Sequence, residues 1–185
     1  MKNKSFILIL ICLSMISCVK EQLETTYNKQ EDQIDKYITK NMIVTNDEGI
    51  TDTLRVIRNG GSNRLVTVEG TGEELKADGH VGFYYAGYTF NGSISTSGMF
   101  VTNHQATAEQ AGWNLTDADY TLMEINITRT ELIEGLRKGL TGVRAGEECE
   151  IIFSGKYGFG NKSFGMIPAK SALLYKIWVV SVTND

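Results

Sequence analysis

The chain has 185 residues, with 18 basic and 22 acidic side chains and a net charge of −4. This length fits one compact domain that can bury an adequate core. The acidic balance, without a basic stripe in the sequence, argues against nucleic-acid binding, because the phosphates would be repelled.

Residues 1–17 have the features of a lipoprotein signal peptide. Two lysines lie within the first four residues, residues 6–16 are almost wholly apolar, and the small Ser17 directly precedes Cys18. An apolar run of 11 residues is well short of the about 20 that cross a bilayer, which disfavours a membrane-spanning anchor. We therefore expect lipidation of Cys18 and attachment to a bacterial envelope membrane.

The residues that follow the cysteine indicate how the domain is attached. Val19 and Lys20 lack the aspartate that holds some lipoproteins in the inner membrane, which favours the outer membrane. Residues 18–27 are polar, and we predict that they form a lipidated tether between the membrane and the folded domain.

A short helix is predicted from Gln30 to Asn41. Ile34, Tyr37 and Ile38 fall on one side of this helix, and acidic residues lie near its start. The helix could serve homodimerisation or client binding, or it could pack on its own domain. The second interpretation is favoured because the segment has only about three turns.

Two strands are predicted next, at Thr51–Arg58 and Arg64–Glu69. The turn Asn59–Ser62, which contains two glycines, separates them. We therefore assign residues 28–63 to an N-terminal helix and strand extension, and residues 64–185 to the main domain.

An insertion is expected within the main domain at about residues 104–119. Residues 106–111 could form one or two helical turns, with Trp113 as an anchor. This segment is either a client-binding flap or a surface excursion pinned by Trp113, and the second interpretation is favoured. His80 and His104 have no cysteine or carboxylate at ligand spacing, so we expect two ordinary surface histidines and no metal site.

A capped helix is predicted over about residues 130–141. Thr128 and Glu131 form a capping box, and Gly142 follows as a C-terminal stop. The apolar face of this helix consists of Leu132, Ile133, Leu136 and Leu140.

Two strands with a glycine-rich loop between them are predicted after the helix. Cys149, Ile151 and Phe153 alternate with two glutamates, so Cys149 is expected to be a buried thiol rather than a nucleophile. The apolar run 172–182 predicts a long final strand. Its Trp178 is expected to be covered by the first strands.

These elements, in this order, resemble the C-terminal half of the FKBP-type peptidyl-prolyl cis-trans isomerases. The matching motifs are Leu132-Ile133-Glu134-Gly135, Gly139-Leu140-Thr141-Gly142-Val143, Gly146-Glu147, Tyr157-Gly158-Phe159-Gly160, Ile167-Pro168 and an earlier strand at residues 81–87. The resemblance covers about residues 64–182. It implies an α+β fold, in which a twisted antiparallel sheet of five to six strands wraps around one central helix, with the short N-terminal helix added.

The resemblance also implies an apolar pocket that binds proline. The catalytic residues that it indicates are Tyr85, Phe100, Ile133, Phe159 and Tyr175, and the further pocket residues are Val101, Leu132, Leu136 and Ile167. Leu136 replaces the tryptophan that usually forms the pocket floor, and Phe159 replaces a tyrosine. The family's Phe-Asp pair is matched by Phe100-Val101 or, in a gap-free count, by Ser95-Thr96, and both alignments lack the aspartate.

Two functions are compatible with this pocket. The first is a peptidyl-prolyl cis-trans isomerase or folding assistant that acts on envelope proteins with prolyl-containing polypeptides as clients. The second is a catalytically weak or inactive binding or chaperone lipoprotein of the same fold. Isomerisation needs no cofactor, because its barrier of about 20 kcal/mol arises from amide resonance and can be lowered by apolar enclosure.

Overall fold

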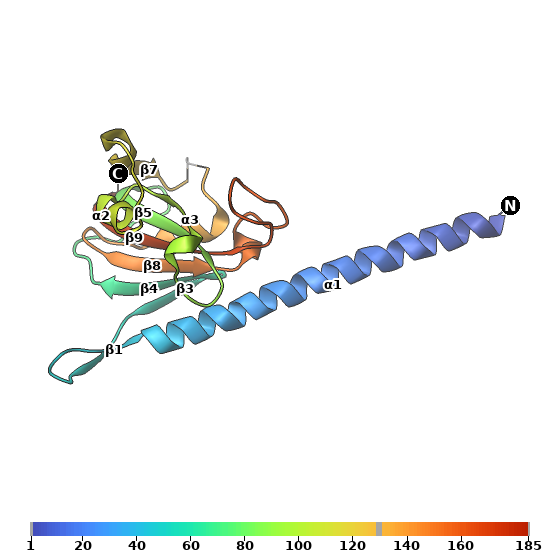
Figure 1. The fold of residues 1–185 in the computed structure, drawn as a ribbon, viewed down its shortest axis with the longest axis horizontal. Coiled ribbons are helices and arrows are strands. Elements are labelled where there is room, and N and C mark those ends of the chain that lie inside the picture. The colour runs from blue at the N-terminus through green and yellow to red at the C-terminus, as the bar shows by residue number, and fades with distance from the viewer. Residues whose placement is uncertain (1, 129–130, 185) are drawn as a thin grey trace.

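The computed structural model describes residues 2–128 and 131–184, with side chains described from residue 21 onward. The described residues form a seven-stranded antiparallel sheet with the order β3-β4-β8-β9-β5-β6, and β7 pairs with β5 (Figure 1). The strands are β3 (Val56–Asn59), β4 (Ser62–Val68), β5 (His80–Phe90), β6 (Met99–Thr102), β7 (Met123–Asn126), β8 (Glu148–Phe153) and β9 (Ala172–Thr183). The predicted α+β class is confirmed, and the sheet has more strands than the five to six expected.

The central strand β8 is buried on both faces. Cys149, Ile151 and Phe153 belong to one hydrophobic cluster, as their alternation with glutamates predicted. Ile152 belongs to a second cluster on the opposite face of the sheet. Burial raises the pKa of the Cys149 thiol well above its usual value, which keeps this side chain protonated and apolar.

Helix α3 (Glu134–Leu140) covers the first of these faces and is shorter than the helix predicted over 130–141. The predicted capping box is wrong, because the hydroxyl of Thr128 donates to the Asn126 side-chain oxygen over 3.0 Å. Ile133, which has an extended backbone, is the residue that precedes the helix. Thr130, the predicted first residue, lies outside the described residues.

Two glycines let helix α3 approach strand β8 closely. A Cβ atom on Gly135 would lie 2.2 Å from the Phe153 ring, and one on Gly139 would lie 2.2 Å from Ile151 Cγ2. Distances this short are incompatible with a side chain at either position. The helix is therefore placed against the sheet by the absence of side chains at these two positions.

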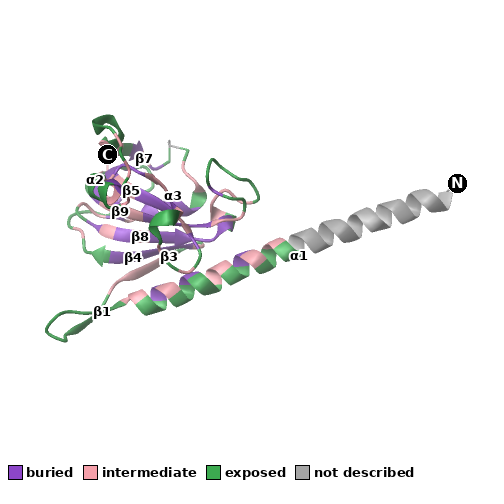
Figure 2. Ribbon diagram, viewed as in Figure 1, coloured by how far each residue is buried: buried purple, intermediate pink, exposed green. Residues whose placement is uncertain are grey.

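The C-terminal part of helix α1 (Lys2–Asn41) packs on the other face of the sheet, and Figure 1 shows the helix running on past the domain. Figure 2 shows its buried positions alternating with exposed ones along the described stretch. Tyr27, Ile34 and Ile38 are 8%, 1% and 2% exposed, at a spacing that puts them on one helical face. The favoured interpretation of a helix packed on its own domain is confirmed.

Residues 18–27, predicted to form a lipidated tether, belong to α1 and are therefore helical, while their role as a tether stays a prediction. The polar residues of this stretch are good helix formers, and burial of Tyr27 extends the apolar face by two turns before Ile34. The predicted signal peptide at 1–17 and the lipidated Cys18 concern side chains that lie outside the described part. Among the described residues, no helix combines the length and apolarity that a bilayer span requires.

One hairpin lies between α1 and the main sheet, and a second hairpin begins the sheet itself. Strands β1 (Ile43–Thr45) and β2 (Thr51–Thr53) pair only with each other among the described residues, so the strand predicted at 51–58 is two strands, β2 and β3. The predicted turn at residues 59–62 joins β3 to β4, and both of its glycines have positive φ. Strand β4 starts at Ser62, just before the predicted domain boundary at residue 64, and pairs with β8.

The predicted insertion at 104–119 forms helix α2 (Gln105–Gln110) and the 3₁₀ turn η2 (Asp117–Tyr120). Trp113 packs against the second hydrophobic cluster, as expected of an anchor. The prediction that His104 is an ordinary surface residue is wrong, because its ring stacks on Trp178 with 3.8 Å between centroids. Trp178, which is partly buried, is thus covered by the first residue of the insertion.

Candidate functional site

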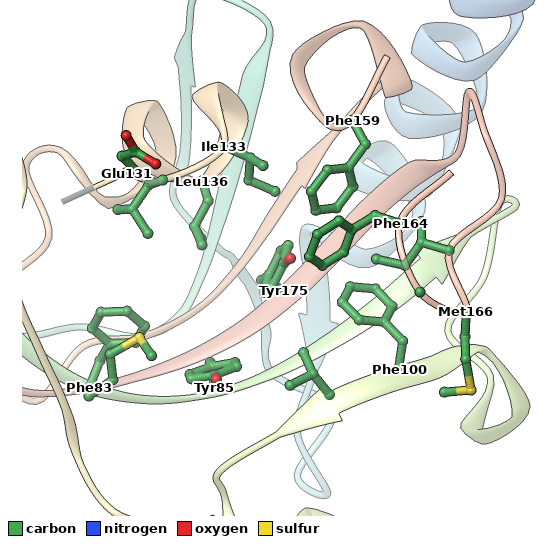
Figure 3. A pocket seen from close by; sticks show the side chains of 15 residues that line it. Phe83, Tyr85, Phe100, Glu131, Ile133, Leu136, Phe159, Phe164, Met166 and Tyr175 are labelled. Carbon is green, nitrogen blue, oxygen red and sulfur yellow. The ribbon is translucent and has the colours of Figure 1, made fainter. Parts of the chain in front are cut away.

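A cavity of about 580 Å³ opens between the start of α3, the sheet and the loop that connects β8 to β9. Figure 3 shows the side chains that line it. All nine residues predicted for the pocket lie in its lining: Tyr85, Phe100, Val101, Leu132, Ile133, Leu136, Phe159, Ile167 and Tyr175. The structure thus brings together residues from five elements, namely β5, β6, the start of α3, the β8–β9 loop and β9, while their catalytic roles remain predictions.

Three aromatic side chains from neighbouring strands form the base of the cavity. Phe100 on β6 meets the Tyr175 ring on β9 edge to face, with 5.8 Å between centroids and 83° between planes. Tyr85 on β5 also faces the cavity (Figure 3). Burial raises the pKa of both tyrosines, so their hydroxyls remain protonated donors at physiological pH.

The start of helix α3 supplies the second wall. Ile133 has φ −59° and ψ 142°, so the chain enters the helix only after this residue. Its side chain and that of Leu136, one turn later, point into the cavity (Figure 3). Leu136 is 7% exposed and occupies the position where the family resemblance leads one to expect tryptophan. A leucine there leaves more room for a ligand.

The loop between β8 and β9 supplies the third wall. Phe159 and Phe164 stack in parallel, with 4.7 Å between ring centroids. Two backbone hydrogen bonds of 2.9 Å between Phe164 and Ile167 close a tight turn, in which Gly165 has φ +54°. Ile167 is buried, whereas Phe164 and Met166 are 63% and 73% exposed. The loop therefore extends the apolar surface beyond the mouth of the cavity.

The two alternative matches to the Phe-Asp pair occupy different places. Phe100 and Val101 lie on β6 and line the cavity. Ser95 and Thr96 are exposed residues of the turn before β6. The structure therefore supports the alignment through Phe100-Val101, which leaves the pocket without the family's aspartate.

Polar groups are scarce in the cavity. Among the described residues that line it, only Tyr85, Tyr175 and Glu131 have polar side chains. Glu131 is exposed, so its carboxylate lies at the rim. Such a lining can enclose an apolar ring and offer two hydroxyl donors, and it provides no nucleophile with an adjacent base.

The comparisons with known proteins agree with this geometry. Residues 72–180 match the model of a protein family described as FKBP-type peptidyl-prolyl cis-trans isomerase. The chain belongs to this family. FK506-binding protein 1 of Aspergillus oryzae is 21% identical over 122 residues, which cover 66% of this chain and 98% of that protein.

Solved structures of similar fold include two bacterial proteins. FkpA from Escherichia coli has a TM-score of 0.52 and 16% identity, with 98% of this chain and 72% of that chain covered. A peptidyl-prolyl cis-trans isomerase from Pseudomonas syringae has a TM-score of 0.56 and 14% identity, with 87% and 96% covered. At these identities the structures show a shared FKBP-type fold.

The FKBP-type pocket of this chain also contains residues that sequence reasoning missed. They are Phe83, Met123, Glu131, Phe164, Gly165 and Met166. Phe83 could have been found, because it precedes Tyr85 by two residues and therefore shares its face of β5. Met123 and Met166 lie outside any motif that the sequence offers, because they come from an edge strand and a loop tip.

Proposed function

We propose that the chain is a peptidyl-prolyl cis-trans isomerase whose site is the aromatic cavity between α3, the sheet and the β8–β9 loop. The observation that carries the proposal is the convergence of the nine predicted pocket residues on one apolar cavity. Rotation about an X-Pro bond requires loss of amide resonance, at a barrier of about 20 kcal/mol. The twisted amide is less polar than the planar one, so an enclosure that excludes water favours it.

The residues of this chain have distinct parts in the proposed reaction. Tyr85, Phe100 and Tyr175 would hold the proline ring, because they form the aromatic base of the cavity. Ile133 lies where the family resemblance implies that a backbone N–H meets a ligand carbonyl. The protonated hydroxyls of the two tyrosines are available as further donors. Each ~1.4 kcal/mol of preference for the twisted amide gives a tenfold rate increase.

The test is a prolyl-tetrapeptide isomerisation assay on the chain from Glu21 onward. We expect acceleration over the solvent rate at micromolar protein, inhibition by FK506, and loss of at least about tenfold in kcat/KM for Phe100→Ala. Val180→Ala, at an exposed apolar residue outside the cavity lining, is the matched control and should retain full activity. Absence of acceleration by the unmodified protein would exclude the isomerase.

A second function, binding of unfolded polypeptides with little catalysis, is favoured by one observation. Phe164 and Met166 line the rim of the cavity and are largely exposed, so they continue its apolar surface past the mouth, where an extended polypeptide would lie. The losses at Leu136 and Phe159 remove surface and a donor from the pocket. A chaperone without isomerase activity would suppress client aggregation and leave the isomerisation rate unchanged.

One variant distinguishes the two functions. Replacing Met166, which is 73% exposed at the rim of the cavity, with serine should reduce suppression of aggregation more than it reduces the isomerisation rate of a short prolyl peptide, because only a long client extends this far beyond the cavity. If the variant suppresses aggregation as well as the unmodified chain does, the exposed loop is not a client-binding surface.

We further propose that the protein acts in a bacterial envelope as a lipoprotein attached through Cys18, with the outer membrane favoured. The support is the basic, apolar and small-residue order before Cys18 and the absence of aspartate after it. Metabolic labelling with palmitate should mark the unmodified chain and not Cys18→Ala. Unlabelled protein, or labelled protein found only in the inner membrane, would contradict the corresponding part of the proposal.

Homodimerisation through the N-terminal helix remains an alternative use of α1. Ile34 and Ile38 are already buried against the sheet of the same chain, so a dimer would have to use other surfaces of the helix. Sedimentation equilibrium of the chain from Glu21 onward tests this, and a single monomeric species would exclude a dimer formed by that part of the helix.

A further inference from the structure

We propose that Gln30 on helix α1 is a positioning residue for the pocket, because its side chain joins the two ends of the loop that forms the third wall. This loop comprises residues 155–170 and is called the pocket loop below. The inference rests on the proposed function for its effect on catalysis, and on the geometry alone for its effect on the loop.

The two ends of the pocket loop meet at Gly155 and Lys170. A Cβ atom on Gly155 would lie 2.5 Å from the carbonyl oxygen of Lys170, so the two backbones are in direct contact. Gly160 connects them further, since its N–H donates to Gly155 O over 2.9 Å and its carbonyl accepts from Lys170 N over 2.7 Å. Lys170 has φ 65°, an uncommon backbone conformation for a residue with a side chain.

The side-chain amide of Gln30 bridges this contact. Its Nε2 donates to the carbonyl oxygen of Lys170 over 2.6 Å, and its Oε1 accepts from the N–H of Gly155 over 2.9 Å. An amide offers a donor and an acceptor side by side, whereas an ionised carboxylate offers acceptors only. Gln30 therefore matches both ends of the loop with a single side chain.

Neighbouring contacts keep Gln30 at this place. The hydroxyl of Ser154, a fully buried residue just before the loop, donates to Glu31 Oε1 over 2.8 Å. Tyr27, one turn earlier on the same helix, is 8% exposed. The bridge thus depends on the docked position of α1, more than 120 residues away in sequence.

The clamped loop carries a large part of the pocket. Phe159, Phe164 and Ile167 all lie between the two ends that Gln30 joins, and all line the cavity. Movement of one end relative to the other would displace the stacked pair Phe159–Phe164. Loss of the bridge should therefore loosen the apolar wall without removing any atom from the cavity.

The test compares Gln30→Met, Gln30→Glu and the control Gln33→Met in the full chain, purified in detergent. Methionine removes donor and acceptor at nearly constant shape, while glutamate retains the acceptor alone. Gln33 is an exposed glutamine on the same helix. Hydrogen exchange of residues 155–170 reports the loop directly and requires no activity.

We expect exchange of the pocket-loop amides to become about tenfold faster in Gln30→Met, which loses two hydrogen bonds, and at least as fast in Gln30→Glu, whose second carboxylate oxygen would face the Lys170 carbonyl oxygen. KM for a prolyl tetrapeptide should rise about three- to tenfold with a smaller change in kcat, because the wall binds rather than reacts. Gln33→Met should match the unmodified chain in both measurements.

Two outcomes would overturn the proposal. Unchanged exchange in Gln30→Met would show that the loop keeps its position without the bridge. Faster exchange with unchanged KM would show that the bridge supports structure only. If the unmodified chain has no isomerase activity, FK506 affinity replaces KM as the second measurement, so failure of the proposed function and failure of the clamp remain distinguishable.

Discussion

The two faces of the sheet are closed by helices of different origin, and the aromatic cavity lies on the face that α3 covers. Helix α3, which lies between β7 and β8 in the chain, is short and covers its face only in part. Helix α1 precedes the whole sheet and covers the opposite face with Ile34 and Ile38. The cavity exists beside α3 because Ile133 and Leu136 at its start leave room that the helix does not fill. The short helix α3 leaves space for a ligand on its face of the sheet. The long helix α1 supports the sheet from the opposite face.

Removal of a side chain beneath α3 should have the largest effect. Phe153 is fully buried, contacts the helix at Gly135 and stacks with Tyr175 at 6.1 Å between centroids. Phe153→Ala should lower the free energy of unfolding by about 3–5 kcal/mol, because a large cavity replaces the ring. Urea unfolding followed by circular dichroism measures this, and a loss below about 1 kcal/mol would contradict the central place of this face.

Truncation of a buried side chain of α1 should change the unfolding transition in a different way. Ile34→Ala should cost about 2–4 kcal/mol, limited by the free energy with which the helix docks. The sheet and α3 should remain folded after α1 is released, so unfolding should separate into two transitions. A single transition of unchanged slope would show that the two faces form one cooperative unit.

A third change concerns the pocket alone. Phe159→Tyr restores the hydroxyl that the family resemblance leads one to expect, and one added hydrogen bond should raise kcat/KM for a prolyl peptide by about fivefold. Phe164→Tyr adds a hydroxyl to the ring stacked on Phe159 and provides the matched control. Equal gains in both variants would argue against a specific contact with substrate at residue 159.

The smallest expected effect is a pH dependence on the α1 side of the sheet. Burial lowers the pKa of His104, which stacks on Trp178, below its usual 6.5. The unfolded chain therefore binds this proton more readily, and the stabilisation is present above about pH 6.5 and lost as the pH falls through the folded-state pKa. Thermal unfolding between pH 5.5 and 7.5 should show a smaller change for His104→Phe than for the unmodified chain. Equal changes would assign the pH dependence to other groups.

The sequence predicted the central elements well because local signals there agree with one another. Gly135 and Gly139 allow close packing of a helix on a strand, and the structure has α3 packed on β8. The alternation around Cys149 and the apolar final strand indicate strands with a buried face, and both strands contribute to the core. The pocket residues followed from motifs that cover both ends of the pocket loop. The residues of the candidate site could thus be predicted from the sequence.

The errors occurred where a residue has two available partners. Thr128 could cap a helix, yet its hydroxyl bonds to Asn126, so α3 begins later than the capping pattern predicted. The polar stretch 18–27 is helical because it is continuous with α1, whose Tyr27 is buried. His104 carried no signal of its stacking on Trp178, because the two residues are far apart in the sequence. Such choices depend on tertiary contacts, which single-sequence patterns do not contain.

The buried thiol of Cys149 can report on local opening of the hydrophobic core. The side chain is 2% exposed, and burial raises its pKa, so a thiol reagent can reach it only after the sheet and α3 separate. In a chain that begins at residue 21 it is also the sole cysteine. The rate of its alkylation under native conditions therefore measures the frequency with which the core beneath the pocket opens to solvent. The measurement needs no added label or engineered site.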